Sequence, residues 1–453
     1  MKSIGIPHLV LGALVLAAAA VAAVDRYEQK HVRPAFIDPD DWAGRTKLTY
    51  WEKWSGFEFE AIEKAVGRYN RTQGRRDRVY VNLINTSQVN VKTMIFTAGG
   101  QPPDLAGNWS IYVAPFAERG ALTSLEKFIA ADQFDLDAYV PAYLETCRYR
   151  DQLWAMPTVP ATTALFYNRK MFREIGQDSP PRTIAELDAI ARKLDRRDGA
   201  GNLVRLGFLH TEPGWWKWSW GYYFGGRITD GKGKVLPDMD PWVRSLAWAD
   251  AYASHYGRGA VNSVQSGFGK FDSPQNAFVA GRVGMVIQGV WMPNFINRYN
   301  RGLEYSVAPF PSEKALDEPV TQVESDCITI PKGAKHPEEA WKFIKWLVSP
   351  EGQSILCGGQ GKHMCLKKLP ADFAKKNMNP HVEFFHRLGF SRKAYIVGRF
   401  PVLSKFRDEM GNAFEQVWQG KAKPGDALEA ARAEIQKRLD ENVARWQYVP
   451  PEQ

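Results

Sequence analysis

The chain has 453 residues, of which 44% are hydrophobic and 24% are charged. This is ordinary for a folded soluble protein, and the length predicts two or three domains. The net charge of +9 is weak support for an acidic ligand, but Lys and Arg are interleaved with 50 acidic residues, so we predict a solvated surface and no nucleic-acid partner. The 16 Trp and 17 Tyr residues are more informative, because their rings combine an apolar face with a polar edge and suit sugars or bases.

Residues 1–24 have the pattern of a targeting segment. Residues 9–24 are almost unbroken in their apolar character, and Ala23 lies where a secretory signal is cleaved. An uncleaved N-terminal anchor is the alternative, because the mostly apolar stretch over residues 4–24 nearly reaches membrane-spanning length. Residues 25–45 are polar and predict a tether. Both alternatives place the bulk of the chain in the periplasm or another extracytoplasmic space, either secreted or tethered.

The first part of the mature chain alternates short strands with helices. Strands are predicted at residues 47–51, 79–84 and 104–106. One helix is predicted to begin at Ser55, which with Glu58 has the spacing of a capping box, and a second covers residues 89–98. The order β-α-β-α-β implies parallel strands with right-handed crossovers.

Aromatic or hydrogen-bonding side chains follow each of these three strands. They occupy residues 51–54, 85–87 and 108–109. Ligands of parallel sheets bind just beyond the carboxyl ends of the strands. We therefore expect these segments to contribute to a ligand site.

Further elements are predicted along the rest of the chain. Helices are expected over residues 184–194 and 338–348 and through most of the last 60 residues. Another helix is expected to end at residues 278–281. Strands are expected at 283–287 and 328–330, and a turn at 198–202. Four cysteines fit an oxidising compartment. Cys357 and Cys365 flank a Gly-rich loop, and either a disulfide or two buried thiols fits their spacing, which predicts no zinc site.

Six short motifs follow one another along the chain. They are residues 98–105 (AGGQPPDL), 166–169 (FYNR), 180–183 (PPRT), 278–291 (FVAGR leading to GVW), 308–311 (APFP) and 330–341 (IPKGAKHPEEAW). The ordered set resembles extracellular solute-binding proteins of the sugar-binding kind, the relatives of maltose-binding protein that serve ABC importers. The match runs from about residue 46 to residue 446.

The resemblance implies an α/β, two-lobed periplasmic-binding-protein fold of type II. Each lobe would be a mainly parallel sheet flanked by helices, with hinge strands crossing between the lobes. Lobe 1 would take residues 46–157 with 326–385, and lobe 2 residues 158–325 with 386–446. Ligand would lie between the lobes and stabilise the closed form through its higher affinity for that state.

A sugar site needs aromatic platforms for C–H faces and polar groups for hydroxyls. Trp291 matches the Gly-x-Trp of the family after a buried strand, and Trp51 and Trp54 follow the first strand, where relatives place ligand contacts. Trp215 and Trp216 belong to four indoles within six residues, which cannot all enter one helix core. The polar and loop candidates are Glu52, Asn108, Trp109, Thr162 and Asp326. The alternative for each is structural: core packing, a solvated carboxylate, loop packing or a hinge cap.

We predict a non-enzymatic substrate-binding component of an ABC importer, which captures a mono- or oligosaccharide by hinge closure. It would act as a monomer, without cofactor or metal, and deliver its ligand to the permease subunits. A secreted carbohydrate-active enzyme and a ligand sensor for a membrane receptor are the alternatives. A glycosidase needs two carboxylates in a catalytic pair, and the sequence has none that is recognisable. His381 and His386 resemble a zinc-protease motif, but they are five residues apart where that motif requires four.

Overall fold

The computed structural model describes residues 42–397 and 399–452. The predicted targeting segment, residues 1–24, lies outside the described residues, as does most of the predicted tether over residues 25–45. Within the described part of the chain, no helix is both long and apolar enough to cross a membrane.

Three parallel strands open the fold, as the sequence predicts. They are β1 (Thr46–Glu52), β2 (Val79–Asn85) and β3 (Leu105–Trp109), and β1 pairs in parallel with both of the others. The intervening helices are α2 (Gly56–Arg71), α3 (Gln73–Arg76) and α4 (Val89–Ala98). Residues of α2 that bury their side chains recur at helical spacing, as Ile62, Val66 and Tyr69 do, so one face of this helix packs against the sheet.

The predicted capping box at Ser55 is wrong. Ser55 precedes α2 but makes no side-chain cap, and the Glu58 carboxylate lies 2.7 Å from the Lys362 ammonium. Gln360 also donates to the Glu58 backbone carbonyl at 3.2 Å. Because Lys362 is almost fully buried, its need for a counter-ion draws Glu58 away from the helix terminus.

Two long strands occupy the centre of the molecule. They are β6 (Ala155–Asn168) and β11 (Thr321–Thr329), which pair with each other antiparallel over residues 155–162 of β6. Farther along, β6 pairs with β9 (Met285–Gly289) and β10 (Tyr305–Ala308), while β11 pairs with β3 and with β12 (Ala394–Ile396). Eight strands of the described chain therefore form one curled sheet, with the path β10-β6-β11-β3-β1-β2.

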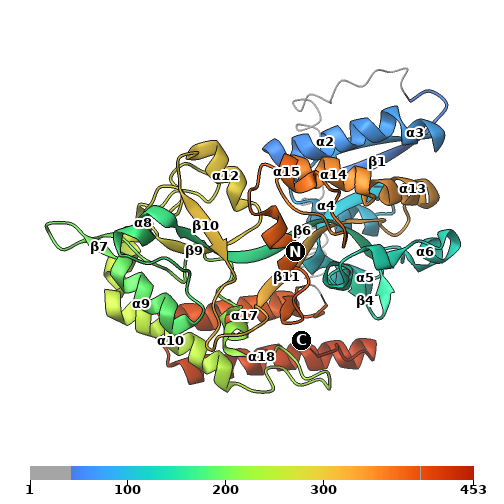
Figure 1. The fold of residues 1–453 in the computed structure, drawn as a ribbon. Coiled ribbons are helices and arrows are strands. Elements are labelled where there is room, and N and C mark those ends of the chain that lie inside the picture. The colour runs from blue at the N-terminus through green and yellow to red at the C-terminus, as the bar shows by residue number, and fades with distance from the viewer. Residues whose placement is uncertain (1–41, 398, 453) are drawn as a thin grey trace, which may run out of the picture.

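Figure 1 shows β6 and β11 between a body around β1 and α13 (Pro337–Leu347) and a second body around β9 and α9 (Ile184–Leu194). Helices α17 (Leu403–Trp418) and α18 (Pro424–Trp446) run along the lower side of that view. The remaining helices are α5 (Val113–Glu118), α6 (Glu126–Asp132), α7 (Pro141–Glu145), α8 (Arg169–Glu174), α10 (Asp240–Tyr256), α11 (Arg258–Ser266), α12 (Met292–Tyr299), α14 (Pro350–Gly359), α15 (Phe373–Lys376) and α16 (Val382–Leu388). The short elements are η1 (Ser110–Tyr112), η2 (Leu136–Ala138), η3 (Trp220–Phe224), β4 (Arg148–Tyr149), β5 (Gln152–Leu153), β7 (Arg196–Arg197) and β8 (Leu203–Arg205).

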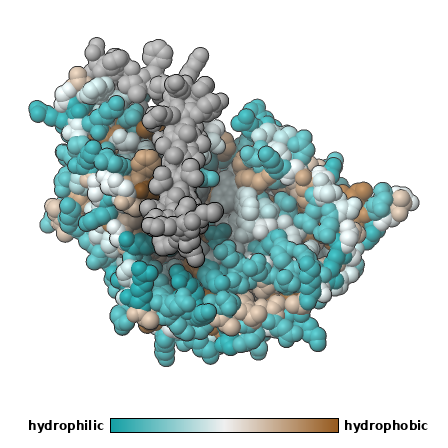
Figure 2. Space-filling view, turned by 180° about the vertical axis from the view of Figure 1, so that it is seen from behind, coloured by the Kyte–Doolittle hydropathy of each residue, from teal (hydrophilic) through white to brown (hydrophobic). Residues whose placement is uncertain are grey.

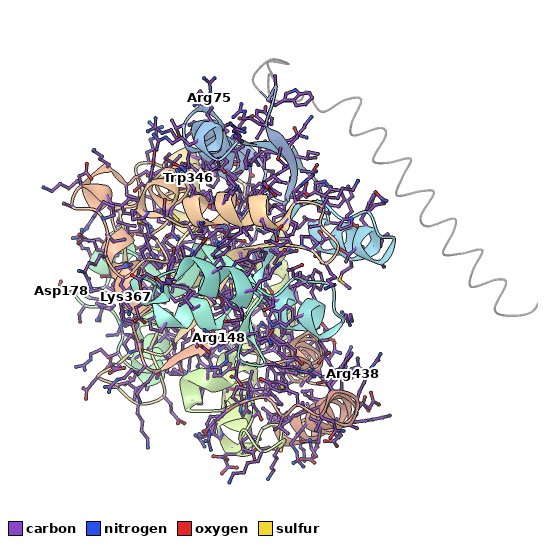
Figure 3. All side chains as sticks on the ribbon, turned by 90° about the vertical axis from the view of Figure 1, so that its right-hand side faces the viewer. Arg75, Arg148, Asp178, Trp346, Lys367 and Arg438 are labelled. Carbon is purple, nitrogen blue, oxygen red and sulfur yellow. The ribbon has the colours of Figure 1, made fainter. Side chains whose placement is uncertain are left out.

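Among the described residues, the hydrophobic core has two large parts. One gathers buried side chains from residues 48–159 and 323–382, and the other from residues 165–439. A smaller group around Phe166, Phe278 and Phe385 packs on the end of β6. The lobe boundaries given above stay predictions. Outside the core, the face in Figure 2 is mainly hydrophilic, and charged side chains such as Arg75 and Arg438 lie at the periphery in Figure 3.

Two further expectations are decided by the structure. Residues 278–281 form turns and do not end a helix, because the Asn276 side-chain oxygen accepts from the backbone N–H groups of Phe278 and Val279 and stabilises a turn there. Cys357 and Cys365 are buried free thiols, as are the two other cysteines. Burial raises the pKa of the Cys365 thiol well above its ordinary value, which keeps the group protonated and unreactive.

Candidate ligand-binding site

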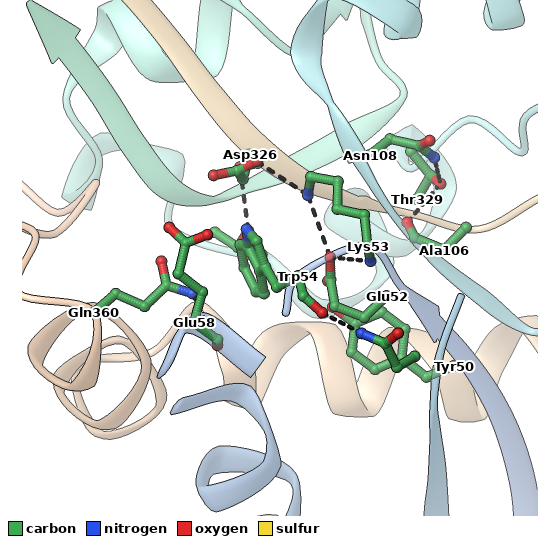
Figure 4. Close-up of polar contacts among 12 residues, drawn as sticks. Tyr50, Glu52, Lys53, Trp54, Glu58, Ala106, Asn108, Asp326, Thr329 and Gln360 are labelled. Atoms are coloured by element: carbon green, nitrogen blue, oxygen red, sulfur yellow. Dashed lines mark hydrogen bonds and ion pairs between the residues drawn. The ribbon is translucent and has the colours of Figure 1, made fainter. Parts of the chain in front are cut away.

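An ammonium group between two carboxylates lies at the carboxyl end of β1. Lys53 Nζ is 3.3 Å from Glu52 Oε1 and 3.0 Å from Asp326 Oδ1 (Figure 4). The Lys53 and Glu52 side chains are only 3% and 1% exposed. Tyr50 Oη donates to the second oxygen of Glu52 at 2.6 Å. The structure thus brings together two predicted site residues, Glu52 and Asp326, through a third that was not predicted.

Two carboxyl groups thus share one ammonium group. Burial by itself would lower the pKa of Lys53, but the Asp326 and Glu52 carboxylates raise it above its ordinary value. Lys53 therefore stays protonated, and its charge holds both carboxylates in place. Such a fixed donor and acceptor set is suited to hydroxyl groups.

Two tryptophans flank this ammonium group. Lys53 Nζ lies 4.5 Å from the ring centroid of Trp54 and 5.1 Å from that of Trp109, within cation–π range. Trp54 is buried, whereas Trp109 is 38% exposed. We call Glu52, Lys53, Trp54, Trp109 and Asp326 the Lys53 cluster.

Trp51 and Asn108 lie beside the Lys53 cluster. The Trp51 side chain belongs to the opposite face of β1 from Glu52, since successive strand residues alternate, and its ring contacts Phe96 of α4 edge-on at 5.0 Å. Asn108 is buried and donates to Thr329 Oγ1 at 3.2 Å, while its own side-chain oxygen has no hydrogen-bond partner within the described residues. That oxygen is an acceptor that a ligand donor would satisfy.

A second aromatic group surrounds Trp291, which follows β9. The rings of Trp216 and Trp291 are stacked at 6.3 Å between centroids, and Trp215 lies 6.2 Å from Trp291 and 4.3 Å from Phe271. Trp215 is 41% exposed, whereas Trp216 is buried. The indole nitrogen of Trp291 is buried and lacks a hydrogen-bond partner in the described part of the chain. We call Trp215, Trp216, Phe271 and Trp291 the Trp291 cluster.

Glycines make room in both clusters. A Cβ atom on Gly289 would lie 2.2 Å from the Trp291 indole, so the ring folds back over the glycine of the Gly-x-Trp motif. A Cβ atom on Gly107 of β3 would lie 2.0 Å from Glu52 Oε2. No side chain larger than hydrogen fits at either position without displacing the functional group.

The two clusters flank the middle of β6. Val159 of this strand pairs with Asp326, and Thr163 pairs with Gly289. The four-residue step from Val159 to Thr163 spans roughly 13 Å along the strand. Between them, buried Thr162 lies 3.1 Å from His363 Nε2, and burial lowers the pKa of His363 to about 3, so this ring is neutral.

An aromatic path also connects the two sides. Phe57, near the start of α2, contacts Phe295 of α12 at 6.1 Å between centroids. Phe295 in turn contacts Phe271 at 4.7 Å. The Trp291 cluster is therefore continuous with the helix that follows Trp54.

Three residues outside the predicted set have notable chemistry here. Lys53 pairs with Glu52 and Asp326. Its position within the Trp-Glu-Lys-Trp run, between predicted site residues, was the signal that could have identified it. Burial raises the pKa of Glu212 to about 7, and this carboxyl lies three residues before Trp215. Gln288 is fully buried on β9, and neither its amide nitrogen nor its oxygen finds a partner among the described residues. No group of three or more potential metal ligands occurs in the region that the structure describes.

Comparison with known proteins decides the family. The sequence model of the bacterial extracellular solute-binding proteins matches residues 58–354. The chain belongs to this family. A putative binding protein of Brucella abortus (strain 2308) is 23% identical to this solute-binding protein over 342 residues, which cover 74% of this chain and 79% of the relative. The maltotriose-binding protein of Pyrococcus abyssi is 24% identical over 340 residues, which cover 70% of this chain and 66% of the relative.

Solved structures agree with this assignment. CpMnBP1 with mannobiose bound superposes with a TM-score of 0.72 at 25% identity, covering 86% of this chain and 100% of that chain. Maltose-bound MalE3 of T. maritima superposes with a TM-score of 0.69 at 19% identity, covering 87% of this chain and 99% of that chain. The resemblance predicted from the ordered motifs and the two-lobed α/β fold are therefore confirmed for this solute-binding protein.

Proposed function

We propose that this solute-binding protein captures a mono- or oligosaccharide between its two lobes and delivers it to the permease subunits of an ABC importer. The observation that carries the proposal is the pair of clusters on either side of β6: indole rings around Trp291, and a locked set of charges around Lys53. Rings and fixed polar groups together are what a sugar requires. Maltotriose and mannobiose, the sugars named for a relative and a structural neighbour, are consistent with this ligand class.

In the proposed complex the partly exposed ring of Trp215 and the ring of Trp291 lie against C–H faces of the sugar. Glu52 and Asp326 accept hydrogen bonds from hydroxyl groups, and the Lys53 ammonium donates one. The unpartnered side-chain atoms of Asn108 and Gln288 gain partners at the same time. Contacts to both clusters favour the closed arrangement of the lobes, because the ligand then binds that state more tightly.

We further propose that the protein binds its ligand without transforming it, acts as a monomer and resides in the periplasm or another extracytoplasmic space. Glu52 and Asp326 share one ammonium ion within 3.3 Å. A glycosidase assigns the roles of proton donor and nucleophile to two separate carboxyl groups, whereas these two are both paired with the Lys53 ammonium.

Thermal unfolding in the presence of neutral and acidic mono- and oligosaccharides tests the proposal. A sugar at 100 times its Kd should stabilise the protein by about 2.7 kcal/mol. We expect this ligand-induced stabilisation with one class of sugar, without product formation, and its loss in Trp291→Ala. Trp42→Ala, which removes an exposed indole outside both clusters, serves as the control and should retain it. Stabilisation by none of the sugars, or cleavage of the sugar during incubation, would overturn the proposal.

A further inference from the structure

A pocket of about 620 Å³ lies apart from both clusters. Three chain segments line it: residues 222–227, which include the end of η3, several residues between 312 and 320 before β11, and residues 392–396 with Arg399 around β12. Arg244 of α10 and Glu452 complete the lining. The volume is in the range that holds a small molecule, and none of the ten residues predicted to bind ligand contributes to it. It is therefore a separate cavity.

The side chains around this pocket are strongly cationic. Six basic residues line it, against two acidic ones; the basic residues are Arg227, Arg244, Lys314, Arg392, Lys393 and Arg399. The four arginines have carboxylate partners, and Arg244, for example, contacts both oxygens of Glu313 at 2.7 and 3.2 Å. Such pairing orients each guanidinium group and leaves some of its five N–H donors available.

The two lysines carry the excess charge. Lys314 and Lys393 are exposed at the pocket, and neither forms an ion pair within residues 42–397 and 399–452. Two positive charges therefore remain uncompensated at the mouth of a concave site, where low-dielectric walls focus the field on an entering anion.

The inner wall of the pocket is aromatic and apolar. Tyr222 and Tyr395 are both buried and stack at 3.9 Å with an angle of 6° between their rings. Tyr395 Oη is held by the Gln322 side-chain oxygen at 3.2 Å, which fixes the ring. Tyr223 and Val320, also buried, extend this wall. A ligand that entered would meet apolar surface inside and cations outside.

We propose that this pocket is a second ligand site, which binds an organic anion: a carboxylate or phosphate group attached to a ring or other apolar body. The anionic group lies among Lys314, Lys393 and the arginines, and the apolar body lies against the tyrosine stack. This site is independent of the proposed carbohydrate site, because no residue of the Lys53 or Trp291 cluster lines it.

Calorimetric titration with four probes tests the two halves of this chemistry. Benzoate and phenyl phosphate combine an anion with a ring, benzamide has the ring without the charge, and inorganic phosphate has the charge without the ring. We expect benzoate or phenyl phosphate to bind more tightly than the other two probes, with an affinity that falls as salt rises. Preference for phosphate-bearing or carboxylate-bearing rings identifies which anion the site takes. The proposal is overturned if benzamide binds as tightly as benzoate, or if none of the four probes binds at millimolar concentrations.

Variants locate the binding. The double variant Lys314→Ala/Lys393→Ala removes only exposed, unpaired charges, so the fold is retained, and the anion should bind roughly fivefold or more weakly. The control Lys367→Ala/Lys368→Ala removes the same charge from another exposed segment and should bind the anion like the wild type. Trp291→Ala should also bind it normally. If Trp291→Ala abolishes anion binding, the anion occupies the carbohydrate site and the inference fails, whereas failure of sugar binding alone leaves it intact.

Discussion

At the scale of single residues, two glycines set where the side chains of both clusters lie. Gly289 allows the Trp291 ring to fold back over the strand, and Gly107 allows the Glu52 carboxylate to lie against β3. In each case an added methyl group would meet the neighbouring side chain at less than van der Waals distance. The effect of substitution should therefore appear in ligand binding as well as in stability.

Gly289→Ala should weaken carbohydrate binding about tenfold, or roughly 1.4 kcal/mol, because the new methyl group displaces the Trp291 ring. Calorimetric titration of the sugar identified by thermal unfolding measures this loss. Gly411→Ala is the matched control: nothing lies within 4 Å of the added atom on α17, so binding should be unchanged and stability should rise by about 0.5–1 kcal/mol. Wild-type affinity in Gly289→Ala would contradict the assigned position of the ring.

The buried Lys53 charge should be essential for stability. In Lys53→Met, the Glu52 and Asp326 carboxylates are left buried without a cation, which should lower the free energy of unfolding by about 3–5 kcal/mol. Urea unfolding at neutral pH measures the change. Lys127→Met removes the exposed partner of Glu338 and should cost less than about 1 kcal/mol. Recovery of stability in Lys53→Met/Asp326→Asn would show that the excess negative charge is the cause.

At the scale of elements, a tertiary contact can decide whether a local capping pattern is used. Thr183 caps α9, since its hydroxyl accepts from the Glu186 N–H at 3.2 Å, and the Glu186 carboxylate reaches back to the Arg182 N–H at 2.7 Å. Ser55 has the same sequence pattern at α2 but makes no such bond, because Glu58 is engaged by Lys362. Identical spacing thus leads to different capping.

Thr183→Ala should lower the free energy of unfolding by about 1 kcal/mol through loss of the cap. Ser55→Ala should change it by much less, since no side-chain hydrogen bond is removed. Denaturant unfolding of the two variants under the same conditions makes the comparison. An equal loss in both would indicate that Ser55 caps α2 in solution.

At the scale of the whole molecule, a buried histidine couples stability to pH. His210 lies in an aromatic cage, 3.9 Å from the Trp248 ring centroid and 4.6 Å from that of Tyr252, and neither of its ring nitrogens has a partner within the described structure. Burial lowers the pKa of His210 well below its ordinary value. In the unfolded chain the ring takes up a proton near pH 6.5, so acidification favours unfolding.

His210→Phe keeps the apolar packing and removes this titration. Between pH 7 and pH 5, the wild type should lose about 2 kcal/mol of stability relative to the variant. Burial raises the pKa of Glu212 to about 7, which acts in the opposite direction, but this carboxyl is present in both proteins and cancels in the difference. Urea unfolding at both pH values measures it. His255→Gln, which changes an exposed ring, should show no such difference from the wild type.

The sequence alone determined the features that depend on near neighbours. Helical periodicity and the stop at Gly99 placed α4 at Val89–Ala98, the apolar spacing after Thr183 placed α9, and the alternation of elements predicted that β1, β2 and β3 run parallel to one another. Ordered motifs predicted the family and the two-lobed fold. The signals for single elements are carried by residues that lie within a few positions of one another, whereas the family signal lies in the order of short motifs between residues 98 and 341.

Only the tertiary structure decided which distant side chains meet. The pairing of Lys53 with Asp326 depends on the register of β11 against β3 and β6, and the stacking of Trp216 on Trp291 depends on how a loop folds over β9. The same holds for Glu58 and Lys362, and for the four cysteines, which remain thiols. Local propensity contains no information on such contacts, because their geometry is set by the packing of whole strands and helices against each other.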